Sequence, residues 1–251
     1  MIVEYFRPNT ITEALSLIGR ENPLTIPIGG GTSIRQKSRL NDLSVVDLQD
    51  LKLNKIECSK DWLEIGATTT LSALEANKEI PEAIREAVHL EGTANTRNLA
   101  TLGGRLVSCD GKSALITTLI AADAITVWDE NRKEIQLGEW FALPSDKPGK
   151  LLLSIKIKRN FVLELEVINR TKLDLPILCI AVARWKSGRV RVALGGFGKA
   201  PQMFFDGPDG NGAEQAAENA CREADDFCAS SDYRRAMATL LTRRCLARIQ
   251  G

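Results

Sequence analysis

The sequence predicts an α+β protein in two parts, a larger domain over residues 1–167 and a smaller one over residues 168–251. Through the larger part, short apolar or alternating segments typical of strands lie between helical segments. The character changes near Asn169, after which two strands and then two helices are expected. The chain has 251 residues, 44% hydrophobic and 26% charged, a composition that gives one or two globular domains an ample core.

The elements of the larger part follow in order. Thr10 and Glu13 have the spacing of a capping box, so a helix is expected from there to about Gly19. Strands are expected at residues 25–28, 44–48, 61–67, 124–128, 151–157 and 161–167, and helices at 70–78, 81–90 and 113–124. The last of these helices is apolar on nearly every side. It is therefore expected to be buried, with its positive N-terminal end able to face an anion.

The smaller part is expected to be an antiparallel sheet with helices. Residues 177–185 and 190–194 predict two strands joined by a tight turn. Residues 201–212 are rich in Gly, Pro and Asp and predict a loop, and residues 213–225 and 231–249 predict helices. The last helix is expected to present a solvated basic face, or alternatively a docking surface for another subunit. Its arginines are Arg234, Arg235, Arg243, Arg244 and Arg248.

Two glycine-rich loops about seventy residues apart carry the strongest functional signal. The first consists of Ile28, Gly29, Gly30, Gly31, Thr32, Ser33 and Ile34, and the second of Thr101, Leu102, Gly103, Gly104 and Arg105. Glycine lets a ligand approach the main chain closely, and consecutive N–H groups can form a concave site for a phosphate. Either loop alone also fits a tight turn. Together they predict that one extended dinucleotide binds between them.

Composition excludes several other classes of function. The formal net charge is +1, which gives no support to a nucleic acid or membrane partner, and no apolar run approaches the ~20 residues of a membrane span. The first residues do not have the pattern of a signal peptide, so a cytoplasmic location is expected. The six cysteines include no C-x-x-C pair, so we expect no metal site and free thiols. The single histidine, His89, lies in an apolar helical stretch and is expected to be structural.

Five segments, taken in order, resemble the motifs of one known family. They are residues 29–34 (Gly-Gly-Gly-Thr-Ser-Ile), 64–69 (Glu-Ile-Gly-Ala-Thr-Thr), 97–104 (Arg-Asn-Leu-Ala-Thr-Leu-Gly-Gly), Arg170 with Asp174, and 231–235 (Ser-Asp-Tyr-Arg-Arg). This set resembles the FAD-binding subunits of molybdenum hydroxylases, the family of the medium subunit of aerobic carbon monoxide dehydrogenase and the flavin domain of xanthine dehydrogenase. The resemblance implies a PCMH or vanillyl-alcohol-oxidase-type FAD-binding domain in two subdomains, followed by a small C-terminal domain.

The resemblance also implies a function. Electrons would pass from [2Fe-2S] clusters in an iron–sulfur subunit to FAD in this chain, and then to NAD⁺ or another acceptor. A third subunit would carry molybdopterin, and the complex would be a dimer of heterotrimers. The protein would position the flavin and tune its potential, so no catalytic residue is assigned. Two alternatives stay open: a stand-alone flavin oxidoreductase, and a scaffold subunit of such a complex that has lost tight FAD binding.

Site residues transfer unevenly from the family. Residues 29–34 and 101–104 match, which implies main-chain contacts to FAD, and Leu152 matches an apolar position against the flavin. Three positions differ from the family's pattern: Arg105 stands where the family usually has Asn, Ala114 where it usually has Asp, and Glu166 where several members have Lys. A guanidinium pairs well with carboxylate and phosphate. We therefore expect Glu166 to orient Arg105 toward the cofactor, unless the two lie far apart and the site has drifted.

Overall fold

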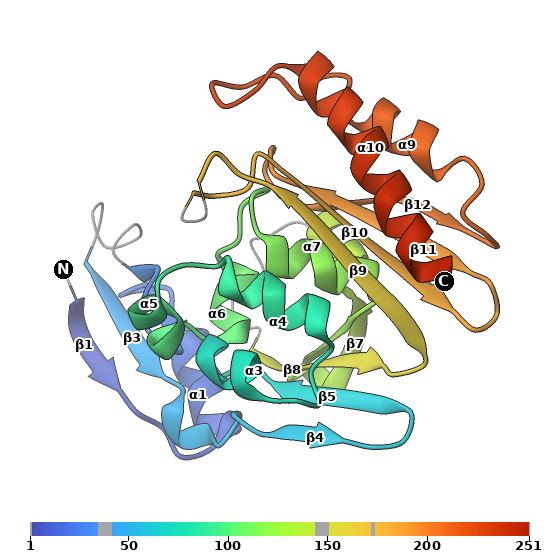
Figure 1. Cartoon of the computed structure of the whole chain (residues 1–251). Helices are drawn as coiled ribbons and strands as arrows, with labels where there is room; N and C mark the ends of the chain where they lie inside the picture. The colour runs from blue at the N-terminus through green and yellow to red at the C-terminus, as the bar shows by residue number, and fades with distance from the viewer. Residues whose placement is uncertain (1, 35–41, 144–150, 172–173, 251) are drawn as a thin grey trace.

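The computed structural model describes residues 2–34, 42–143, 151–171 and 174–250 (Figure 1). The N-terminal unit is a parallel sheet in the order β1-β3-β2, packed against one helix. Its elements are β1 (Ile2–Phe6), α1 (Ile11–Ile18), β2 (Thr25–Ile28) and β3 (Leu43–Asp47). The predicted helix is confirmed, and the Thr10 side chain caps it by accepting from the amide of Glu13. The first glycine loop leaves the sheet where β2 ends.

The second unit is a five-stranded antiparallel sheet in the order β4-β5-β8-β6-β7. Its strands are β4 (Ile56–Cys58), β5 (Trp62–Gly66), β6 (Ile125–Trp128), β7 (Lys133–Gln136) and β8 (Leu152–Lys158). The helices here are α3 (Leu71–Ala76), α4 (Glu82–His89), α5 (Ala94–Leu99), α6 (Leu102–Val107), α7 (Ala114–Ala121) and α8 (Leu137–Ala142), with short 3-10 turns at Gln49–Leu51 and Glu130–Arg132. As predicted, every residue of α7 is buried.

Strand β8 connects the two units. Leu152, Ile155 and Ile157 belong to the core beneath the helices of the second unit. Leu153 and the preceding Leu151 instead pack into the core of the N-terminal unit. By strict alternation Leu153 would face the same side as Ile155 and Ile157, but the pairing of β8 with β6 shifts register between Val127↔Ser154 and Trp128↔Leu152. An irregularity of this kind redirects side chains, so one strand can contribute to both cores.

The C-terminal unit is a four-stranded antiparallel sheet in the order β12-β11-β10-β9. Its elements are β9 (Phe161–Ile168), β10 (Leu178–Trp185), β11 (Val190–Gly195), β12 (Gln202–Gly207), α9 (Ala213–Ala220) and α10 (Ser231–Gln250). Leu178, Ile180 and Val182 belong to the core under α9 and α10. Ala181 belongs instead to the core that contains α7. The sheet therefore lies between α7 and the two C-terminal helices (Figure 1).

Three expectations about elements need correction. Residues 201–212 were expected to be a loop, but β12 lies there and pairs with β11 from Val190↔Gly207 to Leu194↔Gln202. Residues of the second glycine loop form the short helix α6, capped by Thr101. The helix expected at 213–225 ends at Ala220.

The division of the chain into two domains at residue 167 stays a proposal. Strand β9 pairs with β10 along its length, while its Leu163 and Leu165 pack against the core of the second unit.

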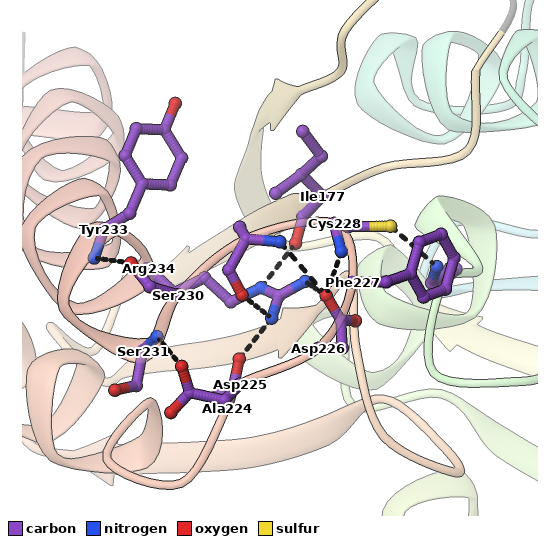
Figure 2. Close-up of polar contacts among 12 residues, drawn as sticks. Ile177, Ala224, Asp225, Asp226, Phe227, Cys228, Ser230, Ser231, Tyr233 and Arg234 are labelled. Atoms are coloured by element: carbon purple, nitrogen blue, oxygen red, sulfur yellow. Dashed lines mark hydrogen bonds and ion pairs between the residues drawn. The ribbon is translucent and has the colours of Figure 1, made fainter.

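The expected solvated basic face of the last helix is wrong for Arg234, which is 0% exposed. Its guanidinium donates to the carbonyl oxygens of Ile177 and Ala229, both at 3.1 Å, and to the Asp226 carboxylate at 2.8 Å (Figure 2). It also donates to the carbonyl of Ala224. Arg234 shares a buried helix face with Ala238 and Leu241. The loop before α10 supplies three of the oxygens that satisfy its charge, and the carbonyl before β10 supplies the fourth.

Candidate cofactor site

The two glycine loops, far apart in the sequence, are in direct contact. A Cβ on Gly29 would lie 2.4 Å from the Oγ1 of Thr101, and one on Gly30 would lie 1.5 Å from the carbonyl oxygen of Leu99. Farther along, the hydroxyl of Ser33 donates to that of Ser108, at the end of α6, at 3.0 Å. Only glycine at these positions allows the two main chains to approach so closely.

The first loop presents a run of main-chain amide groups. Among the residues that the structure describes, the amide groups of residues 29–33 donate to no acceptor, while the amide of Ile34 donates to the carbonyl of Gly31 at 3.3 Å. Gly31 has a φ of +69°, which turns the chain sharply at the middle of the loop. Residues 29–31 are half-buried, and Thr32 and Ser33 are exposed. A run of such amides around a tight turn is an anion-binding geometry.

The second loop uses its amides within the protein. Those of Leu102 and Gly103 donate to the carbonyls of Thr69 and Ala67, at 2.9 and 2.8 Å. That of Gly104 donates to the Oγ1 of Thr101 at 3.2 Å. These three donors, expected to face the cofactor, are occupied: the first two anchor α6 to the segment after β5, and the third belongs to the helix cap. The loop leaves only Gly104 and part of Arg105 accessible.

Leu152 lies near this anchor and is buried. The carbonyl of Ala67 accepts from Gly103, and the amide of Ala67 donates to the carbonyl of Leu153 at 2.9 Å. Two backbone hydrogen bonds thus connect the start of β8 to the second loop. Sequence reasoning missed Thr68 and Thr69, although they lie in a matched motif. Their buried hydroxyls have no partner within the described part of the chain.

The expected pairing of Arg105 with Glu166 is wrong. The Nε of Arg105 donates to the carboxylate of Glu91, which lies between α4 and α5. Glu166 lies on β9 and accepts from Arg248 of α10 at 2.6 Å. The two residues fall on different elements, each with its own partner. The alternative, that positions 105 and 166 lie apart, is the one that the structure supports.

Helix α7 was expected to direct its N-terminus at a ligand, but an anion of the protein already lies there. The carboxylate of Glu91 accepts from the hydroxyl of Ser113 at 2.7 Å and from the amide of Leu115 at 2.8 Å. A negative charge at this end of a helix is stabilised by the free N–H groups and the helix dipole. Ala114, in the same turn, is buried and contributes no polar group.

The Nδ1 of His89 lies 2.8 Å from the carboxylate of Glu75, and the carbonyl oxygen of His89 accepts from Arg97 at 3.3 Å. Arg97 donates to the same carboxylate at 2.8 Å. Burial raises the pKa of Glu75, but the hydrogen bonds from His89 and Arg97 outweigh it, and the pKa is lowered overall. The contacts join α3, α4 and α5, as a structural role requires.

The described residues hold no cluster of three or more His, Cys, Asp or Glu able to bind a metal. They also include no helix long and apolar enough to cross a membrane.

Comparisons with known proteins agree with this architecture. Residues 1–158 match the family described as the FAD binding domain in molybdopterin dehydrogenase. The protein YgfM of Escherichia coli (strain K12) is 30% identical over 247 residues, which cover 96% of this chain and 94% of YgfM. The FAD-subunit of nicotinate dehydrogenase from Eubacterium barkeri is 33% identical over 154 residues, 55% of this chain and 50% of that protein.

Two solved structures share the fold. Reconstituted CO dehydrogenase from Oligotropha carboxidovorans gives a TM-score of 0.83 at 24% identity, covering 98% of this chain and 96% of the matched one. Quinoline 2-oxidoreductase from Pseudomonas putida 86 gives a TM-score of 0.81 at 20% identity, with the same coverage. The fold class expected from the motifs is confirmed. The chain belongs to the family of FAD-binding domains of molybdopterin dehydrogenases, and FAD is the cofactor of that domain.

Proposed function

We propose that this chain is the FAD-binding electron-transfer subunit of a molybdopterin-dependent hydroxylase or dehydrogenase. It takes electrons from [2Fe-2S] clusters of an iron–sulfur subunit and passes them through FAD to NAD⁺ or another acceptor. A molybdopterin-binding subunit completes the complex, as a dimer of heterotrimers. The observation that carries this proposal is the run of amides at residues 29–33, which have no partner among the described residues and lie against the second glycine loop.

In this proposal, the chain binds and orients the cofactor. The first loop, Ile28, Gly29, Gly30, Gly31, Thr32, Ser33 and Ile34, holds the anionic diphosphate with its amides. The second loop, Thr101, Leu102, Gly103, Gly104 and Arg105, forms the opposite wall. Leu152 supports the flavin from the buried start of β8. When bound, FAD supplies the chemistry of accepting single electrons and releasing pairs.

The names of the relatives support this assignment. One is the FAD-subunit of nicotinate dehydrogenase, and another is subunit beta of the caffeine dehydrogenase of Pseudomonas sp. (strain CBB1). These complexes act on different substrates. We therefore infer that substrate choice resides in the molybdopterin subunit rather than in this chain. All six cysteines are unpaired, which fits the reducing cytoplasm where we place the complex.

The test is to purify the full chain, record its absorbance spectrum, and identify the cofactor released by heat. We expect flavin absorption and released FAD, or uptake of FAD on addition. A chain that stays colourless after addition of FAD would contradict the proposal and favour the scaffold alternative. Copurification with iron–sulfur and molybdenum subunits separates the proposed complex from a stand-alone flavin oxidoreductase.

A further inference from the structure

Glu91 is a buried acidic residue whose carboxylate accepts hydrogen bonds from three protein groups. It is 2% exposed and accepts from the hydroxyl of Ser113, the amide of Leu115 and the guanidinium of Arg105. Two of these donors belong to the N-terminal turn of α7. The orientation of the carboxylate is therefore fixed by α7 and does not depend on Arg105.

Arg105 has donor capacity beyond this pair. Its side chain is 19% exposed and contacts Glu91 through Nε. Among the described residues, no acceptor is paired with its two outer nitrogens. A guanidinium held through Nε presents these two nitrogens as a planar fork that matches an oxyanion.

Arg105 lies on α6, the helix whose C-terminal end contacts the first loop. It follows Gly104, which is exposed, and it precedes Ser108 by one helical turn. Ser108 contacts Ser33 of the first loop. Two sets of donors without partners among the described residues, the amides of residues 29–33 and the outer nitrogens of Arg105, therefore lie on the same pair of adjoining segments.

We propose that Glu91 is a positioning residue, which holds Arg105 so that its outer nitrogens bind an anionic group of FAD. That group is either the diphosphate or the reduced flavin ring. The inference rests on the proposed function of the chain. It also accounts for two departures from the family pattern: Glu91 takes the place of the acid missing at Ala114, and Arg105 neutralises it and adds a cation toward the cofactor.

The test uses the full chain freed of flavin and titrated with FAD, with Kd read from flavin fluorescence. We expect Arg105→Gln to raise Kd about tenfold, because the variant loses a charge-assisted hydrogen bond to the anionic group. Arg105→Lys keeps the charge and loses the fork, so its Kd should rise less. Glu91→Gln should raise Kd in the wild-type background and have no effect in the Arg105→Gln background, because it acts only through Arg105.

Riboflavin and the midpoint potential distinguish the two anionic groups. If Arg105 binds the diphosphate, Arg105→Gln leaves riboflavin affinity and the potential unchanged. If it faces the flavin ring, riboflavin affinity falls, and the potential falls too, because the cation that favoured the reduced anion is gone. Either result supports the inference.

Asp123→Asn is the matched control, because Asp123 pairs with the buried Arg191 between α7 and β11. It should lower the thermal midpoint and leave Kd unchanged. The inference is overturned if Arg105→Gln and Glu91→Gln lower the thermal midpoint without changing Kd or the potential. It is also overturned if Asp123→Asn raises Kd equally. Failure of the wild-type chain to bind FAD would overturn the proposed function and this inference together.

Discussion

Gly30 lies directly against the carbonyl oxygen of Leu99, so close that a Cβ would be 1.5 Å from it. This contact joins the loop after β2 to the segment before α6. It fixes where the amides of residues 29–33 stand relative to the second loop. No rotamer change can relieve a clash with a backbone atom, so the contact depends on glycine.

We therefore predict that Gly30→Ala separates the two loops and abolishes FAD binding, with a lower thermal midpoint. Gly31→Ala is the matched control in the same loop. A Cβ there meets nothing within 4 Å, but φ is +69°, so only backbone strain of about 1 kcal/mol is expected. Thermal unfolding and the FAD content of both variants test this. Equal loss of FAD in the two variants would contradict the role given to the contact.

Glu166 is predicted to have no part in cofactor binding. Its partner Arg248 is half-exposed and also pairs with Glu164 at 2.9 Å. An exposed pair of this kind contributes at most about 1 kcal/mol. Glu166→Gln should therefore leave the Kd for FAD unchanged, and its effect on stability should add to that of Arg105→Gln. A double-mutant cycle that shows coupling between positions 105 and 166 would restore the pairing that the structure rejects.

Arg234 is predicted to be essential for the C-terminal unit. Replacing it by Met removes the cation that satisfies Asp226 and three backbone carbonyls (Figure 2). Breaking a buried charged pair costs about 3–5 kcal/mol. The neighbouring Arg235→Met, which loses a half-exposed pair with Glu218, should cost at most about 1 kcal/mol. Urea unfolding of both variants measures the difference, and similar losses would show that burial of Arg234 contributes little.

Asp206 is predicted to contribute to acid sensitivity. Its pKa is lowered from 3.8, first because Arg189 donates to its carboxylate, against the effect of burial. A carboxyl whose pKa is lowered by folding stabilises the native state above its unfolded pKa, and this stability is lost as the pH falls through the folded pKa. In Asp206→Asn, the thermal midpoint should therefore fall less steeply than in the wild type as the pH drops below about 4. Thermal midpoints from pH 7 to pH 3 test this, and an unchanged slope would contradict it.

Much of the fold could be predicted because hydrophobic periodicity and capping signals agree with the structure. Thr10 caps α1, and the apolar run after Ser113 is a buried helix. Strand β12 was missed because Met203, Phe204 and Phe205 are surrounded by Gly, Pro and Asp. Its hydrogen bonds come from β11, and such tertiary pairing outweighs local turn propensity.

The site was predicted less completely, because hydrogen-bond partners distant in sequence cannot be read from a motif. The meeting of the two glycine loops was anticipated, but α6 was not, since two glycines disfavour a helix. Its burial of Leu102 and Leu106 and its cap at Thr101 offset that cost. Likewise, the sequence does not show which acidic residue pairs with Arg105. The pairing with Glu91 depends on the packing of α4, α6 and α7.

The central claim is that the amides of residues 29–33 hold FAD, while those of residues 102–104 anchor α6. Amide hydrogen exchange, with and without FAD, tests both halves. We predict that FAD strongly slows exchange at residues 29–33, and that residues 102–104 are already protected without it. Unchanged exchange at residues 29–33 in the FAD-bound chain would contradict the account.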